Sequence, residues 1–238
     1  MDIAGKVIQA GSDEKSAAFQ KEVLPELSKF LQGNLSEQTL LDNSRVLLDF
    51  DQLKLKTDSD VRVYFVGEGS GYQNTLGFNL NGKGISDASS LIFPNASSPV
   101  STFDPSSNPD RRRSAPLLPG DFVSLGKLPG GSLLDFFLIA KGANGGTTAF
   151  STGRSANPDG INHVVAFAYQ KTNIPYLIIG FEDLLSGGDR DFIDLFIAVE
   201  MGAGTVEFLT AAPEPAMAAT LLTFLGLTLR RRRTVSHS

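Results

Sequence analysis

The 238-residue chain has no cysteine, no tryptophan and only two histidines, His163 and His237. The lack of cysteine excludes disulfide bonds, thiolate catalysis and cysteine-based zinc sites. Two histidines are too few for a multi-histidine metal centre. A chain without cysteine also fits export from a bacterial cell, because it avoids oxidation chemistry there.

Charged residues are scarce as well, at 20% of the chain, whereas hydrophobic residues make up 41% and include 17 phenylalanines. This is enough apolar material for a core, and low charge with 24 glycines suits a turn-rich β protein. The net charge is −5, but the 17 basic and 25 acidic residues before Pro213 give that part −8. An acidic body argues against nucleic acid as a partner, because binding phosphates needs a basic surface.

Apolar periodicity predicts a helix followed by many strands. Residues 13–32 carry apolar side chains at helical spacing, with Pro25 expected to kink or split the helix, and a helical turn is expected at 36–42. From Val46 onward, apolar residues alternate with polar ones, as in half-buried strands. The expected strands are 46–50, 53–55, 61–65, 76–80, 121–125, 132–140, 162–170, 176–182, 191–199 and 203–209.

Short strands separated by turn residues, with no helices between them, predict an all-β fold. An antiparallel β-sandwich or jelly roll is the expected architecture. We expect three parts: a helical N-terminal segment (1–45), a β-sandwich domain (46–210) and a C-terminal tail containing an apolar helix (211–238).

The stretch from Pro94 to Pro119 is rich in serine and proline and is expected to be a long exposed loop. It contains the run Arg111-Arg112-Arg113. This run allows two interpretations, a contact with an anion or polysaccharide and a solvated charge run.

The last 26 residues combine a proline-containing tripeptide, an apolar run and a cluster of arginines. Ala216 to Leu229 carries no charge and would span about 21 Å as a helix, less than the roughly 30 Å of a bilayer core. A core helix rarely ends in consecutive cations, whereas a membrane segment does on its cytoplasmic side, and long arginine side chains can reach the interface. The pattern predicts an inner-membrane segment that leaves residues 1–212 outside and ends in Arg230, Arg231, Arg232 and Arg233.

The tripeptide Pro213-Glu214-Pro215, the apolar run and the arginine cluster occur in the order of a PEP-CTERM sorting signal, which this tail resembles. The resemblance implies processing by an exosortase, a transpeptidase-like membrane enzyme that acts near the tripeptide. It also implies delivery to the surface or extracellular matrix of a Gram-negative-type bacterium. Proteins with this signal normally carry an N-terminal secretion signal, and residues 1–45 show none, so we expect the true start to lie upstream of Met1.

Five carboxylates fall within 13 residues between two apolar strands, with Arg190 as the one cation among them. Unpaired carboxylates at the mouth of buried strands would repel one another and raise one another's pKa. Calcium resolves this repulsion, because it takes about six to eight oxygens from carboxylates, loop carbonyls and water. Gly187-Gly188 let the backbone turn its carbonyls inward. We expect one calcium ion to be bound jointly by Glu182, Asp183, Asp189, Asp191 and Asp194.

The alternative for this segment is a hydrophilic hairpin tip in which Asp and Gly only form the turn, and the spacing is not that of an EF-hand loop. The residues Phe181-Glu182-Asp183, Gly187-Gly188-Asp189-Arg190-Asp191-Phe192 and Asp194 resemble the signature of domain-of-unknown-function 4114. Ile193 departs from that signature, where Asn is usual. The likeness spans roughly 60–200 and includes Val63-Tyr64-Phe65-Val66, Gly67-Glu68-Gly69, Tyr72, Phe136-Phe137-Leu138-Ile139, Gly142, Asn157-Pro158-Asp159-Gly160 and His163. It implies an extracellular β domain, frequent in surface and matrix proteins, without an established activity.

His163 shares a strand face with Val165, Phe167 and Tyr169 in this interpretation. A lone histidine in such surroundings is more often a core or edge residue than a metal ligand. A triad of His163, Asp159 and a serine can be drawn, but no sequence feature marks a nucleophile. We therefore expect a structural role for His163 and no catalytic residue.

Three functions from different classes fit these features. The one we favour is a non-catalytic surface or matrix protein, associated with biofilm or exopolysaccharide, with a calcium-stabilised β domain. The second is a carbohydrate-binding module of the same matrix, although such modules usually present Trp or Tyr platforms and this chain has no Trp and four Tyr. The third, a hydrolase, needs paired carboxylates across a cleft, whereas these acids lie on one hairpin. The expected partners are an exosortase-type enzyme, the inner membrane and matrix polysaccharide.

Overall fold

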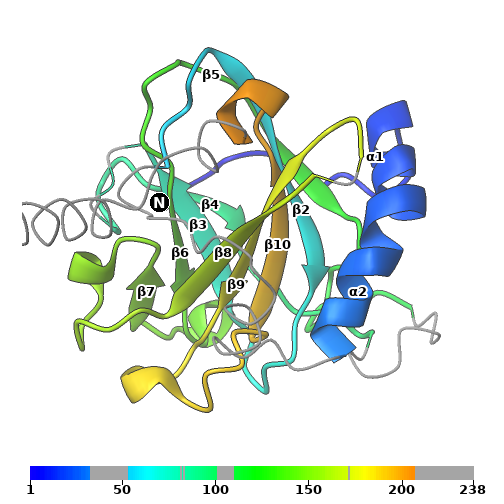
Figure 1. Cartoon of the computed structure of the whole chain (residues 1–238). Coiled ribbons are helices and arrows are strands. Elements are labelled where there is room, and N and C mark those ends of the chain that lie inside the picture. The colour runs from blue at the N-terminus through cyan, green and yellow to red at the C-terminus, as the bar shows by residue number, and fades with distance from the viewer. Residues whose placement is uncertain (33–52, 81, 83, 101–109, 171, 207–238) are drawn as a thin grey trace, which may run out of the picture.

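The computed structural model describes residues 1–32, 53–80, 82, 84–100, 110–170 and 172–206 (Figure 1). This part of the chain is mostly β-structure, in two five-stranded sheets. The first sheet has the order β1 (Asp2–Ile3), β4 (Ser90–Phe93), β3 (Thr75–Asn79), β6 (Asp135–Ile139) and β7 (Ala149–Ser151). The second has the order β5 (Phe122–Leu128), β2 (Ser59–Gly67), β10 (Leu195–Glu200), β9 (Tyr176–Phe181) and β8 (Val164–Tyr169). All neighbours are antiparallel except β1 and β4, which confirms the predicted all-β class.

The inner faces of the two sheets meet in one hydrophobic core. On β2, Val61, Val63 and Phe65 are fully buried in this core, together with Leu138 of the other sheet. Tyr64, between them in sequence, belongs to a second apolar cluster on the outer face of its sheet. The alternation seen in the sequence therefore separates two packed faces, because successive side chains of a strand point in opposite directions.

A helix covers the outer face of the second sheet (Figure 1). It runs from Glu14 to Gln32 as α1 (Glu14–Ala18), a π-helical turn (Phe19–Val23) and α2 (Leu24–Gln32). The ring of Phe19 stacks on that of Tyr64, with 4.2 Å between their centroids. Because this sheet is covered on both faces, β9 and β10 are continuous apolar runs rather than alternating ones.

Pro25 does not end the helix. A proline has no N–H to donate, and its ring crowds the carbonyl four residues earlier. The predicted disruption takes the form of the π-helical turn just before it, where the Leu24 N–H donates to the Phe19 carbonyl. The chain therefore continues into α2 with only a local change of hydrogen bonding.

Several predicted elements differ from the observed ones. Residues 203–206 form a helical turn, so the strand predicted at 203–209 is wrong over its described part. Residues 53–55 contribute one isolated bridge, and the strand predicted at 191–199 begins only at Leu195. The alternation pattern misses β1, β4 and β7, because two to four residues are too few to establish a period.

Parts of the predicted organisation lie outside the described residues: the elements at 36–42 and 46–50, and the tail from Pro213 to Arg233. No helix in the described ranges has the length and apolar character needed to cross a bilayer. Residues 94–100 and 110–119 contain no named strand, as predicted for a loop. Ala96 and Leu117 are nevertheless buried in the core, so this loop packs on the sandwich.

Candidate metal centre

The five predicted metal ligands lie on the connection between β9 and β10, at one end of the second sheet. Leu195 pairs with Phe181 at the end of this ladder, so Glu182 and Asp194 are the first residues beyond it on either side. The Glu182 N–H donates to the carbonyl of His163, the residue before β8, at 2.9 Å. The Asp183 N–H donates to Asp194 Oδ2 at 2.8 Å, which closes the base of the loop. Glu182 and Asp194 therefore face each other because of the strand register.

The loop itself is tightly curled. Ser186, Arg190 and Phe192 have φ angles of 66°, 59° and 54°, in the left-handed region that L side chains disfavour. Gly188 passes directly beside the Glu182 carboxylate, where a Cβ would lie 2.2 Å from Glu182 Oε1. Only glycine fits this approach, and residues in such conformations persist only where the surrounding structure holds them.

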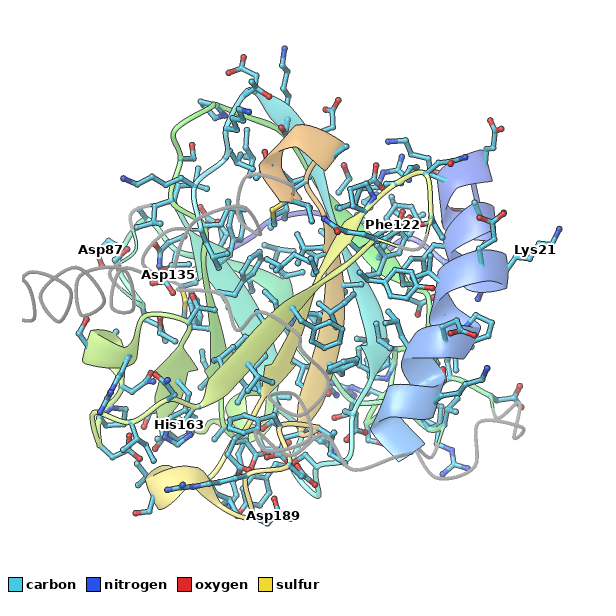
Figure 2. The ribbon with its side chains drawn as sticks, viewed as in Figure 1. Lys21, Asp87, Phe122, Asp135, His163 and Asp189 are labelled. Carbon is cyan, nitrogen blue, oxygen red and sulfur yellow. The ribbon has the colours of Figure 1, made fainter. Side chains whose placement is uncertain are left out.

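The curled loop brings all five predicted ligands together in two overlapping groups. One group is Glu182, Asp183 and Asp194, and the other is Glu182, Asp189 and Asp191. Within each group, carboxylate oxygens lie within 4.8 Å of one another. Figure 2 shows Asp189 on this loop, at the end of the molecule where the His163 label also lies. Each group has the ligand type that a hard cation prefers.

Glu182 is the most deeply buried of the five residues, at 1% exposure. Its Oε1 accepts a hydrogen bond from the Leu184 N–H at 3.2 Å. Its Oε2 has no hydrogen-bond partner among the described residues. A buried carboxylate oxygen without a donor is energetically costly, and a bound cation would remove that cost.

Burial and mutual repulsion disfavour full ionisation of this cluster when no cation is bound. Burial raises the pKa of Asp194 to about 8, and the charges of Asp183 and Glu182 add to the effect. Burial also raises the pKa of Glu182 and of Asp191, with repulsion from Asp189 and Asp183 adding in both cases. The side chains of Glu182 and Asp194 interact directly, so the charge of one carboxyl group affects the pKa of the other. Either a shared proton or a cation is therefore needed to hold the two carboxyl groups side by side.

Two residues that the sequence analysis did not name, Ser70 and Asn74, support the site from the connection after β2. The Ser70 hydroxyl and the Asn74 Nδ2 both donate to Asp183 Oδ2, the latter at 2.7 Å. Gly67 of β2 pairs with Phe196 of β10, which places the residues after β2 beside the loop. Ser70 and Asn74 reach the site because β2 pairs with β10, and these strands lie far apart in the chain. The local periodicity of the sequence does not predict this pairing.

His163 and Asp159 position the tip of the loop. His163 is fully buried, its Nε2 lies 2.9 Å from Asp159 Oδ2, and its ring stacks on Phe150 with 3.9 Å between the centroids. Asp159 Oδ2 also accepts a hydrogen bond from the Ser186 N–H at 2.8 Å. Backbone donation from Ser186 and the contact with His163 lower the pKa of Asp159. The histidine thus lies behind the loop and is absent from both carboxylate groups.

Two details of the predicted surroundings of His163 need correction. Strand β8 begins only at Val164, so the alternation that places Val165 on the outer face does not include His163. Its stacking partner, Phe150, belongs instead to the core between the sheets. His163 Nδ1 has no hydrogen-bond partner among the described residues, so no hydroxyl there completes a triad.

The arginine run of the long loop also differs from both sequence interpretations at its first position. Arg111 Nη2 donates to Asp121 Oδ1 at 2.8 Å, and Arg111 Nη1 donates to Asp121 Oδ2. Asp121 is fully buried, so this bidentate pair fixes the loop to the sandwich. Arg112 and Arg113 are exposed.

An open cavity of about 460 Å³ adjoins the acidic loop. Asp183 and Gly188 line it on the side of the metal centre. Lys141 lines it too, with its Nζ 4.0 Å from the centroid of the Tyr72 ring. The cavity and the carboxylate groups therefore share residues.

Residues 128–202 match the family model of the Domain of unknown function (DUF4114). The matched range contains β6 to β10, the acidic loop and His163, which confirms the domain part of the resemblance expected from the sequence. The segment from Val63 to Tyr72 lies outside the match. No curated protein and no solved structure matches the chain.

Proposed function

We propose that this protein is a non-catalytic component of a bacterial surface or extracellular matrix whose β-sandwich domain is stabilised by calcium. One observation carries the calcium part. Glu182 Oε2 is buried without a hydrogen-bond partner among the described residues, and Glu182 offers a carboxylate oxygen within 4.8 Å of oxygens of four further acids, two in each group. A hard divalent cation satisfies this oxygen and removes the repulsion between the acids.

Calcium fits this loop better than magnesium does. The available ligands are carboxylate oxygens and the carbonyls of a curled, glycine-containing loop. Calcium accepts many oxygens in an irregular arrangement, whereas magnesium prefers a tighter octahedral shell and keeps several of its waters. Ligands contributed in an irregular arrangement from one curled connection suit the less demanding ion.

Calcium should stabilise the fold through this loop. The unfolded chain does not hold the five carboxylates together, so the ion binds the folded state preferentially. Such a ligand stabilises the folded state by about 2.7 kcal/mol when its concentration is a hundredfold above the dissociation constant. For a domain of this size, that corresponds to a rise in melting temperature of several degrees.

The test is thermal unfolding of the full chain, measured in calcium, in magnesium and in a chelator. Wild type is expected to melt several degrees higher in calcium, and less so in magnesium. Glu182→Gln should lose the calcium response while remaining folded in chelator, because the substitution also relieves repulsion. Asp87→Asn is the matched control, since Asp87 is exposed and remote from Asp189 (Figure 2). Identical melting of wild type in calcium and chelator would overturn the calcium proposal.

The location is proposed from the tail alone. The order of Pro213-Glu214-Pro215, the apolar run and the arginines Arg230 to Arg233 supports sorting by an exosortase-type enzyme at the inner membrane, followed by release to the surface or matrix. The acidic body of the chain is compatible with that environment and disfavours nucleic acid as a partner.

A second candidate function is carbohydrate binding, and the cavity beside the loop supports it. Tyr72, Lys141, Thr147 and Thr148 line this cavity and offer an aromatic ring, a cation and hydroxyls. Binding of extracted matrix polysaccharide, measured with and without calcium, tests it. Binding that is lost in Tyr72→Ala and Thr148→Ala, with the calcium response intact, would favour this function. Equal binding by wild type and both variants would exclude the cavity as the binding site.

A further inference from the structure

The ten carboxylate oxygens of the acidic loop are not arranged around a single point. Two oxygens bound to the same calcium ion lie within about 5 Å of each other, because each is about 2.3–2.6 Å from the ion. The described residues meet this condition in two groups, one with Asp183 and Asp194 and the other with Asp189 and Asp191. No group among them combines members of the two pairs. Glu182 is the one residue common to both.

From this arrangement we propose that the loop binds two calcium ions bridged by the Glu182 carboxylate. The inner ion is bound by Glu182, Asp183 and Asp194, and the outer ion by Glu182, Asp189 and Asp191. The inference rests on the proposed calcium binding and replaces the single ion expected from the sequence with a pair.

The position of Glu182 supports a bridging role. It is the first residue after β9 and is buried, with Oε2 unpartnered among the described residues. Gly188 packs directly against its carboxylate and holds it in place, since a Cβ there would lie 2.2 Å from Oε1 and 3.0 Å from Oε2. A carboxylate with one oxygen toward each of two ions is a common arrangement in two-metal sites, where the ions lie about 3.5–4 Å apart.

The charge of the loop fits two ions better than one. The five acids carry −5 when ionised, and Arg190, whose Nε lies close to Gly187, carries +1. One divalent ion would leave a net charge of −2 in a partly buried loop, whereas two would leave none. Uncompensated buried charge is energetically costly, so the charge that remains after the first ion binds favours binding of a second.

The two positions differ in their exposure, which predicts different affinities. Glu182 and Asp183 are buried and Asp183 Oδ2 is fixed by Ser70 and Asn74. Asp189, by contrast, is exposed at the outer position. A rigid site in a low-dielectric environment binds a cation more tightly than an exposed one. The inner ion is therefore expected to bind first and to leave last.

The experiment is a count of bound calcium per chain by equilibrium dialysis with elemental analysis, supported by isothermal titration calorimetry. Wild type should bind two ions in two resolved steps. Asp189→Asn and Asp191→Asn should each bind one ion and lose the weaker step. Asp183→Asn should lose the tighter step, and Asp87→Asn should still bind two. Circular dichroism in chelator checks that each variant is folded.

The possible counts separate the two proposals. Two ions in wild type and one in the Asp189 and Asp191 variants support the bridged pair. One ion in wild type overturns the pair but leaves calcium stabilisation intact. No ion in wild type overturns both. Two ions retained in the Asp189→Asn and Asp191→Asn variants overturn the assignment of the outer ligands. Asp189 is exposed, so its variant allows that test even if Glu182 or Asp183 variants fail to fold.

Discussion

At the scale of single residues, a glutamate and a glycine define the candidate site. Glu182 belongs to both carboxylate groups and is the first residue beyond the last paired position of β9. Gly188 lies against it at a distance that no side chain tolerates. The missing side chain at position 188 leaves the space that the Glu182 carboxylate occupies.

Gly188→Ala is expected to lower the free energy of unfolding and to weaken the calcium response, because the new Cβ would displace Glu182. Gly145→Ala is the matched control, since Gly145 has a φ of 84° but nothing lies within 4 Å of its Cβ position. The control carries the left-handed backbone penalty of about 1 kcal/mol. Gly188→Ala adds overpacking of about 1–3 kcal/mol and the cost of a backbone at φ 46° and ψ −130°, outside the left-handed helical region. Urea unfolding with and without calcium measures both. Equal losses in the two variants would argue against the close packing of Gly188 on Glu182.

The raised pKa of Asp194 predicts how the free energy of unfolding of the metal-free protein depends on pH. Folding raises its pKa from 3.8 to about 8, so between these values the folded state holds a proton that the unfolded state has released. Stability rises with pH only where the unfolded state binds more protons. The contribution of Asp194 is therefore largest at acidic pH and is lost as the pH rises toward about 8.

Urea unfolding in chelator across this pH range provides the measurement. Wild type should lose stability relative to Asp194→Asn as the pH rises from about 4 to about 8, because the asparagine does not titrate. Calcium should reverse the trend, since its ligands must be deprotonated. A difference between the two proteins that is constant with pH would contradict the raised pKa of Asp194.

At the scale of elements, the N-terminal helix is an integral part of the sandwich. Phe19, Val23 and Leu27 are buried in the outer cluster with Tyr64 and Tyr176. Lys15 and Glu200 add an ion pair between helix and sheet, and Arg62 pairs with Asp13 at the helix N-terminus. Covering the outer face leaves β9 and β10 buried along their whole length, and this burial fixes the ends of the two strands.

Phe19→Ala is expected to destabilise the domain by about 3–5 kcal/mol, because it removes a fully buried ring that stacks on Tyr64. Lys21→Ala is the matched control in the same helical turn, where the side chain points into solvent (Figure 2). It should change the free energy of unfolding by less than about 0.5 kcal/mol. Chemical unfolding followed by circular dichroism measures both. A small effect of Phe19→Ala would show that the helix contributes little to the sandwich.

At the scale of the whole molecule, the chain combines a domain that has a candidate metal centre at one end of a sheet with a tail that we propose carries sorting information. Residues 128–202 match a recognised domain family, whereas the tail lies outside the described residues. The proposed calcium requirement and the proposed sorting are independent properties. Each can fail without the other, so they need separate tests in the cell.

Deleting residues 213–238 in the producing bacterium is expected to release the protein from the membrane fraction. Replacing Pro213, Glu214 and Pro215 by alanine should instead leave it in the membrane, because the apolar run and the arginines remain while the tripeptide is lost. Fractionation and immunoblotting follow both variants. A deletion variant that fractionates as the full chain does would overturn the sorting proposal.

The sequence by itself determined which residues could form the site and most of the strands around it. The clustering of Glu182, Asp183, Asp189, Asp191 and Asp194 is local, because all five lie on one connection between two apolar strands. The helix over 14–32 and the alternation in β2 are local too, since periodicity depends only on near neighbours along the chain.

Only the tertiary structure decided how these residues are grouped. The register of β9 and β10 sets Glu182 opposite Asp194, and the pairing of β2 with β10 brings Ser70 and Asn74 to Asp183. The charge pattern of the sequence likewise does not predict the ion pair between Arg111 and the buried Asp121. These contacts join segments whose separation in sequence carries no periodic signal, because they follow from the packing of two sheets around a common core.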